Sequence, residues 1–551
     1  MTSEFLDVMF FPGAWMEQHW KEMTVGGLVV SAVMLGENQF GRRRRSRHLA
    51  GVIALAACSA VALQILPFRF FSVEAVTTEA LTWGNSFDAV IYAFSQVAAG
   101  KTLLADLPSQ YGLAPEVTAP LFVLTGLSVF SFVTFLGALQ VAALCALAVL
   151  LHRHVRSTPL AAASFFTLLI SSGLFLYLRG HATEIYLQYF PLRFFCPTVA
   201  LLIFSFYSAR PNLALLSALG LFSGVAIFWN VDTGVPIVAA IAATLLARTL
   251  IGRRGSPSDF IPVAAYLVIA VAALGVCFAG LRLKAGVPLK LAEALAYQRI
   301  FYGSGFGMLP LPLPFHPWQT VLAVYAAGAV AALFGWRARR SGGTTDVLFC
   351  SSILGLGLFT YYQGRSHVYC LMMVLWPAVL AGAILTDRVL RAVRRGRMPR
   401  SMIAAVYPFV LFVCLASVTL ALWVPALIKA AEVSISTLRE TRDPIVADEL
   451  KFIRETRSGR SCLILAQRQG IYYATLGIAS PVPGPGLVGT LLQKDLDDLV
   501  HAVLQGQTAC IYLGTGKASE PFVGIDRTAL IARYPISSAS ALGTMLLLEP
   551  R

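Results

Sequence analysis

Charged side chains are scarce in this chain of 551 residues. Asp, Glu, Lys and Arg together make up 13% of it, whereas hydrophobic residues make up 57% and the mean hydropathy is +0.71. An ordinary globular domain has about twice that share of charged residues and fewer apolar ones. The composition therefore argues against a soluble globular fold and predicts a mainly α, polytopic membrane protein.

Several common motifs are missing as well. The nine cysteines form no CxxC pair and no Cys/His spacing, so no metal-binding cysteine motif is expected. The first residues lack a basic region and a small-residue cleavage site, so no cleavable signal peptide is expected. Gly514-Thr515-Gly516 follows a strand-like run but lacks a Walker lysine or a full GxGxxG pattern, which favours a plain turn.

The positive charge of the chain has a local origin. The formal net charge is +15, but the residues from Ala430 onward contain 12 acidic and 12 basic side chains. The whole excess therefore lies earlier, in clusters beside apolar runs, of which Arg42 to Arg45 is the first. Membrane orientation and anionic lipid headgroups explain such clusters, so membrane lipids are expected partners and nucleic acid is not.

Long apolar runs predict about eleven transmembrane helices. The runs lie near 48–67, 129–151, 160–178, 192–209, 213–229, 234–251, 260–281, 318–336, 346–362, 368–387 and 402–425. Threading them from a cytoplasmic N-terminus sends every basic cluster to the cytoplasmic side, as the positive-inside rule requires. The expected location is the cell inner (plasma) membrane, with multiple crossings.

The chain divides into three expected parts. They are a cytoplasmic or interfacial segment 1–47, a transmembrane domain 48–428 with a long outer loop 68–120, and a small periplasmic α/β domain 429–551. In the last part, Ser461–Ala466 and Ala509–Gly514 have the pattern of buried strands, and a helix is expected from Lys494 to Leu504. Cys462 and Cys510 are the plausible disulfide partners.

The outer loop 68–120 is unusually acidic for this protein. It holds two basic side chains and five carboxylates, which are Glu74, Glu79, Asp88, Asp106 and Glu116. An amphipathic run from Asp88 to Ala98 is expected to lie on the membrane surface. Either Asp88 or Asp106 could take the proton of an acceptor hydroxyl as a general base. Alternatively, Asp88 caps the helix that it precedes, and Asp106 is a turn residue before Pro108.

Three strings of the chain carry a family resemblance. They are the Gly-Lys-x-Leu-Leu-x-Asp-x-x-Ser-Gln-Tyr-Gly string at 100–112, Phe228–Gly234 at a polar break between two apolar helices, and Tyr361–His367 at the end of another. In this order they resemble bacterial membrane glycosyltransferases of the GT-C superfamily. The resemblance implies a polyprenyl-phosphate-sugar donor, a catalytic Asp or Glu in the first outer loop, and inverting hexosyl or pentosyl transfer. The acceptor would be an extracytoplasmic glycan, lipid or protein.

The chain departs from the common pattern of that family at two points. It has no adjacent Asp-Glu or Asp-Asp pair soon after the first crossing, which leaves the choice of base open. It also lacks the Trp-Trp-Asp motif expected of oligosaccharyltransferases, which argues against transfer of a preassembled glycan to Asn. No cofactor is certain; a divalent metal ion could assist, but no compact ligand set is visible.

A lipid-phosphate donor calls for a fixed cation near the headgroups, and the planar fork of arginine suits phosphate. Arg365 is the best candidate, with an interfacial snorkelling arginine as the alternative. His367 beside it is either a structural, headgroup-level histidine or a general acid. Arg193 is a further outer cation that could meet the phosphate.

Gln110 and Tyr111 are expected to line the same site. Asp232 lies in a polar break between apolar helices, where a carboxylate is costly unless it is paired or used, so capping and functional roles both stay open. Two other functions compete with glycosyl transfer. A lipid-linked glycan polymerase or ligase would need essential arginines in a large late loop, and a transporter or flippase would show paired halves and mid-membrane charges.

Overall fold

The structure is a computed structural model of the whole chain. It describes residues 25–29, 31, 87–174, 189–252, 257–303, 308–313, 315–338, 342–366, 368–440, 444–466, 468–487, 489–506, 508–515 and 527–550. The predicted first crossing, 48–67, lies outside the described residues, as do Glu74, Glu79 and His367.

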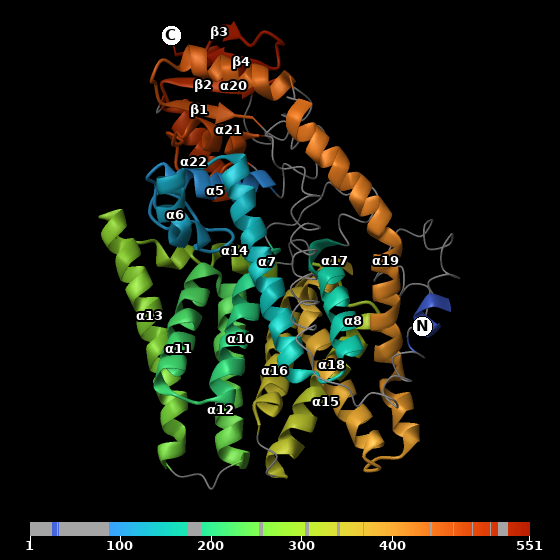
Figure 1. The fold of residues 1–551 in the computed structure, drawn as a ribbon. Helices are drawn as coiled ribbons and strands as arrows, with labels where there is room; N and C mark the ends of the chain where they lie inside the picture. The colour runs from blue at the N-terminus through green and yellow to red at the C-terminus, as the bar shows by residue number, and fades with distance from the viewer. Residues whose placement is uncertain are drawn as a thin grey trace.

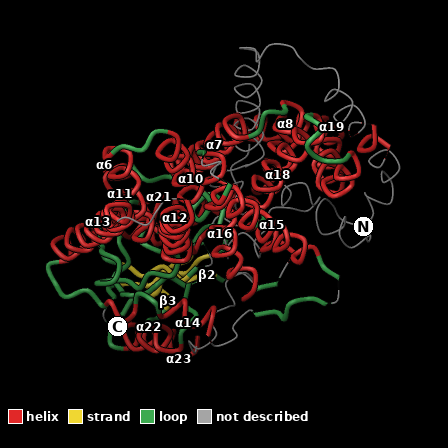
Figure 2. Tube along the Cα trace, turned by 90° about the horizontal axis from the view of Figure 1, so that it is seen from below, coloured by secondary structure: helices red, strands yellow, loops and turns green. Residues whose placement is uncertain are grey.

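Long helices run alongside one another through most of the molecule (Figure 1), and an end-on view shows them grouped into one bundle (Figure 2). They are α7 (Val129–His154), α8 (Thr158–Leu169), α10 (Phe195–Ala209), α11 (Leu213–Trp229), α12 (Val231–Gly252), α13 (Ile261–Ala285), α15 (Pro317–Arg337), α16 (Gly343–Gly364), α18 (Trp376–Arg394) and α19 (Ile403–Glu440). Each apolar run predicted within the described residues is helical, although the run 368–387 is divided between two helices. The fold is mainly α, as the composition predicts.

Six of the described helices are long and apolar enough to span a membrane. They are α7, α12, α13 with the turn before it, α15, α16 and the first part of α19. By contrast, α10 has 15 residues and α11 has 17, fewer than the about 20 that a straight crossing needs. The chain is therefore a multi-pass membrane protein, and the count of eleven crossings stays a prediction.

The predicted span 368–387 is wrong as a single helix. The structure divides it into α17 (Val368–Val374) and α18, with the break at Leu375. The reason is Pro377, which lies in the first turn of α18. Proline has no backbone N–H and its ring clashes with the preceding turn, so it begins a helix more readily than it continues one.

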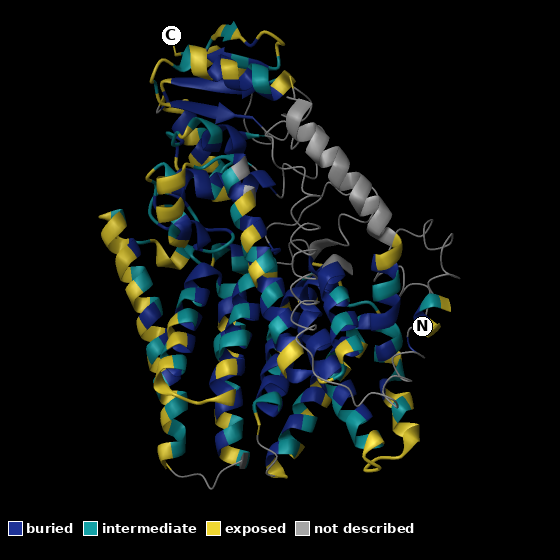
Figure 3. Ribbon diagram, in the orientation of Figure 1, coloured by how far each residue is buried: buried dark blue, intermediate teal, exposed yellow. Residues whose placement is uncertain are grey.

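The helices differ in how far the protein covers them. In the span of α16, 67% of the residues are buried, against 17% in the span of α13. Figure 3 shows this difference, since α13 is largely exposed at the rim of the bundle. The centre of the bundle therefore includes α16, and α13 presents its apolar side chains outward, where lipid is the expected solvent.

Shorter elements lie at the ends of the bundle. They are α5 (Ala89–Ala98), α6 (Ala114–Thr125), η3 (Ile170–Leu174), η4 (Pro257–Phe260), η5 (Leu291–Glu293), α14 (Ala296–Gly303) and η6 (Arg400–Met402). Three of them, α5, α6 and α14, lie between the bundle and the C-terminal sheet (Figure 1). We call the bundle end that carries these three helices the outer end, and the opposite end the inner end.

Helix α5 is where it was predicted, and its position on a membrane surface stays a prediction, but the helix is covered by protein to an extent that its amphipathic pattern does not indicate. Eight of its ten residues are buried. Val90 and Phe94 pack against the bundle, whereas Tyr92 belongs to the core of the C-terminal domain. The tail of the chain folds back onto the helix, so both of its faces are covered.

The C-terminal domain is a small α/β fold, as predicted. Its elements are α20 (Pro444–Arg457), β1 (Cys462–Leu465), α21 (Gln469–Leu476), α22 (Gln493–Leu504), β2 (Cys510–Gly514), α23 (Arg527–Arg533), β3 (Ile536–Ala539) and β4 (Met545–Leu548). The strand order is β1-β2-β4-β3, with β1 and β2 parallel and the other two pairs antiparallel. The predicted disulfide between Cys462 and Cys510 is present, across the directly paired residues of β1 and β2.

Side chains alternate across this sheet and give it two apolar layers. Cys462 and Ile464 of β1 join a core with α20 and α21, whereas Leu463 and Leu465 join a core with α22 and α23. A strand whose successive side chains meet apolar partners on both faces reads as a continuous hydrophobic run. The Cys-Leu-Ile-Leu segment of β1 has that pattern. The predicted boundary at 428/429 falls inside α19, which continues to Glu440.

Candidate active site

The first two strings of the resemblance meet at the outer end of the bundle. The amide of Leu113 donates to the carbonyl of Trp229 at 3.0 Å, and the Asn230 side chain donates to the carbonyl of Tyr111 at 3.1 Å. Gly112 has φ +96°, and a Cβ there would lie 2.2 Å from the Trp229 carbonyl oxygen. Only glycine allows this approach, so the loop 109–113 is fixed onto the break between α11 and α12.

A buried ion pair continues the site from that break. Arg193 Nη2 lies 2.7 Å from Asp232 Oδ2, and the two side chains are 5% and 8% exposed. Trp229 fixes the neighbouring backbone, because its indole N–H donates to the Leu192 carbonyl at 2.7 Å. A buried charge needs a partner of opposite sign, and each member of this pair supplies one. The carboxylate at this costly position is therefore paired, and the functional and capping roles of Asp232 stay predictions.

The third string lies next to the same ion pair. The guanidinium of Arg193 is 5.2 Å from the centre of the Tyr361 ring. The Tyr189 ring is 5.3 Å from that of Tyr361, and the buried Tyr189 hydroxyl has no hydrogen-bond partner among the described residues. A buried hydroxyl of this kind is costly, which makes it a natural contact for a polar ligand.

Arg365 ends α16 at the outer end. Its guanidinium lies 4.4 Å from the centre of the Phe301 ring, which belongs to α14. Arg193 lies over Tyr361, which is four residues before Arg365 on α16. The two predicted phosphate-binding arginines therefore both lie at the outer end of α16. No motif of the sequence singles out Phe301, because its contact with Arg365 joins distant parts of the chain.

Asp88 lies deep under the C-terminal domain. Its side chain is 2% exposed, and Oδ1 accepts the amide of Ile471 at 3.2 Å, at the beginning of α21. It makes no capping hydrogen bond to its own helix, so the simple cap interpretation is wrong. Burial raises the pKa of the Asp88 carboxyl to about 7, although the amides of Gly470 and Ile471 and the charge of Arg468 act against that rise.

The close fit around Asp88 depends on Gly470. A Cβ at that position would lie 2.7 Å from the Asp88 carbonyl oxygen and 2.9 Å from the Tyr92 amide nitrogen. The neighbouring Gln96 side chain accepts the amide of Ser480 at 2.7 Å. The C-terminal domain therefore packs directly against helix α5.

Asp106 has a different environment. Its Oδ2 accepts the amide of Thr102 at 2.8 Å and closes a short turn, which is the alternative role that the sequence left open. Another carboxylate of the loop, Glu116, lies 2.7 Å from Lys284 and accepts the amide of Leu103. Both side chains hold the shape of the loop.

Gln110 and Tyr111 line a small cavity of about 30 Å³ between α5 and the C-terminal domain. Leu192 and the C-terminal residues Gly484 and Pro485 complete its wall. The two predicted site residues therefore face a space that the C-terminal domain closes. Within the described residues, no group of three or more His, Cys, Asp or Glu side chains could hold a metal ion, so we derive no step through a metal.

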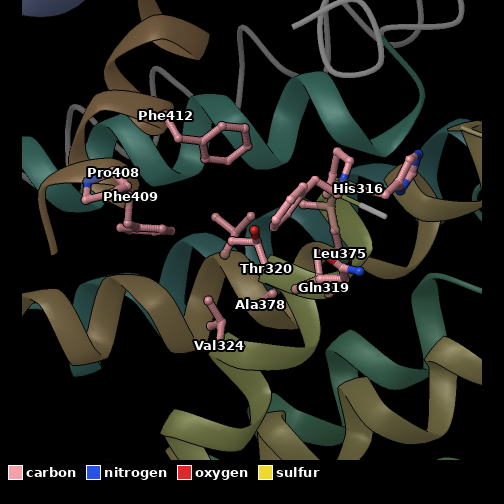
Figure 4. Close-up of a pocket in the computed structure, with 13 residues that line it drawn as sticks. His316, Gln319, Thr320, Val324, Leu375, Ala378, Pro408, Phe409 and Phe412 are labelled. Atoms are coloured by element: carbon pink, nitrogen blue, oxygen red, sulfur yellow. The ribbon is translucent and has the colours of Figure 1, made fainter. Parts of the chain in front are cut away.

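A larger apolar cavity of about 420 Å³ lies between α15, α18 and α19. Figure 4 shows Phe409 and Phe412 toward one end and His316 toward the other. The His316 ring stacks on Tyr362 at 6.4 Å, and Tyr362 is three residues from Arg365. One residue of the cavity wall therefore contacts the helix that ends at the candidate phosphate ligand.

Comparisons with known proteins gave distant structural matches. No protein-family model and no curated protein matches this chain. The chain is similar to ArnT from Cupriavidus metallidurans bound to undecaprenyl phosphate, with 13% identity and a TM-score of 0.45 over 90% of this chain and 98% of ArnT. The apo state of ArnT gives 12% and 0.45, over 91% and 98%.

The chain is also similar to the Archaeoglobus fulgidus oligosaccharyltransferase in complex with Zn and sulfate. The identity is 15% and the TM-score 0.44, over 90% of this chain and 73% of that enzyme. At these identities and TM-scores, the likeness assigns neither a family nor an activity to this chain.

Proposed function

We propose that this chain is a GT-C-type membrane glycosyltransferase. It would transfer a hexose or pentose, with inversion, from a polyprenyl-phosphate donor to an extracytoplasmic glycan, lipid or protein. The observation that carries the proposal is the meeting of the three motif strings at one end of the bundle, through Tyr111 with Asn230 and Arg193 with Asp232 and Tyr361. Strings separated by more than a hundred residues come together, as a shared site requires.

The donor phosphate would lie between Arg193 and Arg365. Guanidinium groups bind phosphate oxygens through charge-assisted hydrogen bonds, which are stronger than neutral ones. Asp232 holds Arg193 in place, and the Tyr189 hydroxyl is available as a further donor. The leaving group of the reaction is the polyprenyl phosphate, so cations at this point would stabilise its negative charge.

The polyprenyl chain would occupy the cavity between α15, α18 and α19. Its lining includes Val321, Val324, Val379 and Phe412, which offer the apolar surface that an isoprenoid requires. The cavity lies among the membrane-spanning helices and ends beside His316, near the segment of Arg365. A lipid bound there would have its chain in the bundle and its phosphate at the outer end.

Asp88 is the base that we favour over Asp106. A general base works best with a pKa near the operating pH, and burial raises the pKa of Asp88 to about 7. Asp106 is bonded to the backbone of its own turn. Because α21 covers Asp88, the acceptor would reach this carboxylate only when the C-terminal domain moves away from α5.

The proposed topology places the outer end on the periplasmic side of the inner membrane and the N-terminus in the cytoplasm. The Cys462–Cys510 disulfide supports this orientation, because disulfides persist in oxidising compartments.

Binding of undecaprenyl phosphate, compared with undecaprenol, tests the donor site. Both lipids have the same chain, so the ratio of their Kd values isolates the phosphate. We expect the wild-type protein in detergent to bind the phosphate at least about tenfold more tightly, and Arg365→Ala to abolish most of that preference. Arg210→Ala removes an exposed cation at the inner end and should leave the ratio unchanged. A wild-type protein that does not distinguish the two lipids would overturn the proposal.

The chain-binding cavity is tested by the same pair of lipids. Val324→Trp fills part of the cavity and should weaken both lipids by a similar factor, leaving their ratio intact. For the chemistry, Asp88→Asn and Asp106→Asn are compared by the amount of glycan product at matched expression. Loss of product in the first variant alone is the expected result, and full activity in both would rule out the first loop as the source of the base.

A further inference from the structure

Helix α14 joins the C-terminal domain to the bundle. The Tyr297 hydroxyl donates to Asp495 Oδ2 of α22 at 2.9 Å, and the Tyr297 side chain is fully buried. A second link lies beside it, where Lys494 Nζ is 2.6 Å from Glu293 Oε1. The tyrosine contact is expected to hold the two parts together more strongly than the lysine contact. The Lys494 side chain is 64% exposed, and ion pairs at the surface contribute little free energy.

One turn further along, the same helix contacts the end of α16. The Phe301 ring lies 4.4 Å from the Arg365 guanidinium carbon. Gly364, just before Arg365, faces Tyr302, whose ring carbon would be 3.5 Å from a Cβ at that glycine. Tyr297 and Phe301 are four residues apart, so a single helical turn separates the contact with the C-terminal domain from the contact with Arg365.

We propose that Phe301 is the positioning residue of Arg365, and that α14 transmits the docking of the C-terminal domain to the donor-phosphate site. The inference rests on the proposed function, because it takes Arg365 as a ligand of the donor phosphate. The C-terminal domain would then set the affinity for the donor without touching the phosphate itself.

The physical reason is the mobility of arginine. A free arginine side chain has many rotamers, and fixing it on a ligand has an entropic cost. The face of an aromatic ring attracts a guanidinium and restricts its plane. With the guanidinium already held over Phe301, less freedom remains to be lost when phosphate binds.

Three variants test the role of Phe301, with the ratio of Kd values for undecaprenol and undecaprenyl phosphate as the readout. Phe301→Ala should lower the preference for the phosphate by roughly five- to thirtyfold, and Phe301→Tyr, which keeps the ring, should restore it. Phe206→Ala is the matched control. Its ring lies 4.3 Å from the Arg153 guanidinium, at the inner end, so it removes a contact of the same kind away from the site. The control should leave the ratio unchanged.

Two further variants test the link through α14. Tyr297→Phe removes only the hydroxyl that bonds Asp495, and it should lower the phosphate preference in the same direction as Phe301→Ala, by roughly two- to fivefold. Asp497→Asn changes another carboxylate of α22, one that accepts a hydrogen bond from Gln493 and not from α14, so it should have no effect on the ratio.

The outcomes separate this inference from the function on which it rests. If Arg365→Ala leaves the ratio unchanged, the donor-phosphate assignment is wrong and the positioning role falls with it. If Arg365→Ala lowers the ratio but Phe301→Ala does not, only the positioning role is wrong. An unchanged ratio in Tyr297→Phe, together with a lowered one in Phe301→Ala, would remove the coupling to the C-terminal domain and keep the role of Phe301. A melting temperature for each variant shows that the protein remains folded.

Discussion

The two ends of the helix bundle both contain buried charges, but they use them differently. At the inner end, Asp346 accepts hydrogen bonds from Ser208, Arg248 and Trp336, which come from α10, α12 and α15. Every one of these contacts joins one helix to another. The carboxylate is 2% exposed and links the inner ends of these helices.

At the outer end, the charged groups belong mainly to loops and helix ends. Arg193 precedes α10 and Asp232 lies in the first turn of α12, whereas Arg365 ends α16 and stacks on an aromatic ring of α14. A buried tyrosine hydroxyl lies in the same part of the molecule, and one end of the apolar cavity, at His316, lies toward it. The difference teaches that burial of a charge alone does not indicate a binding site. A better indication is a charge that lies beside polar groups or a cavity that a ligand could contact.

The sharpest way to test the inner end is Asp346→Ala. Removing the carboxylate leaves Arg248 partly buried, with its side chain 21% exposed, and deprives Trp336 of its acceptor. Breaking a buried pair in this way costs about 3 to 5 kcal/mol, so a large fall in the melting temperature in detergent is expected. Glu455→Ala breaks an exposed pair with Lys451 at 3.9 Å and should cost less than about 0.5 kcal/mol. Equal losses in the two variants would contradict the structural role of Asp346.

Asp88 gives the outer end a pH dependence that the inner end need not share. Burial raises the pKa of Asp88 from its ordinary 3.8 to about 7, so the folded protein keeps a proton that the unfolded chain has released between these pH values. Protonated Asp88 therefore favours the folded state. This contribution to the free energy of unfolding is fully present below about pH 4, and it is lost as the pH rises through 7. Over that range the wild-type protein should lose up to about 4 kcal/mol relative to Asp88→Asn.

The measurement for Asp88 is the melting temperature of both proteins at a series of pH values. In glycan synthesis the sign is opposite, since a base must be ionised, and wild-type activity should rise as the pH passes through about 7. Parallel stability curves for the two proteins would mean that Asp88 is not the titrating group.

A pair of double variants compares the two ends directly. Arg193→Met with Asp232→Leu replaces the outer ion pair by apolar side chains, which is often nearly neutral for stability. Arg248→Met with Asp346→Leu also leaves Ser208 and Trp336 without their acceptor, so it should lower the melting temperature. Only the first should lose the preference for undecaprenyl phosphate over undecaprenol, by about tenfold. A comparable loss in the inner-end double variant would show that the site is not confined to the outer end.

The smallest expected effect belongs to Asp106→Asn. The asparagine keeps a side-chain oxygen that can accept the Thr102 amide, so the turn should survive with a change of less than about 1 kcal/mol. Glycan product should stay within about threefold of the wild-type amount. A loss as large as that of Asp88→Asn would reverse the order in which we place the two carboxylates.

Most of the helices could be predicted because a membrane helix consists of a continuous apolar run. The C-terminal strands were also visible, since both faces of β1 and β2 are buried and their residues are apolar throughout. The break at Leu375 could have been found from Pro377. The burial of α5 could not, because its amphipathic pattern says that one face is apolar but not that a domain more than 350 residues later covers the other.

The sequence by itself determined the membrane character, the positions of the helices and the three strings at which the site would be sought. These depend on local composition and spacing, which a chain carries in any conformation. Only the tertiary structure decided which charges meet: that Asp232 pairs with Arg193, that Arg365 lies against Phe301, and that Asp88 lies under α21. The free energy of a buried charge depends on what surrounds it, and for these residues the surroundings come from distant parts of the chain.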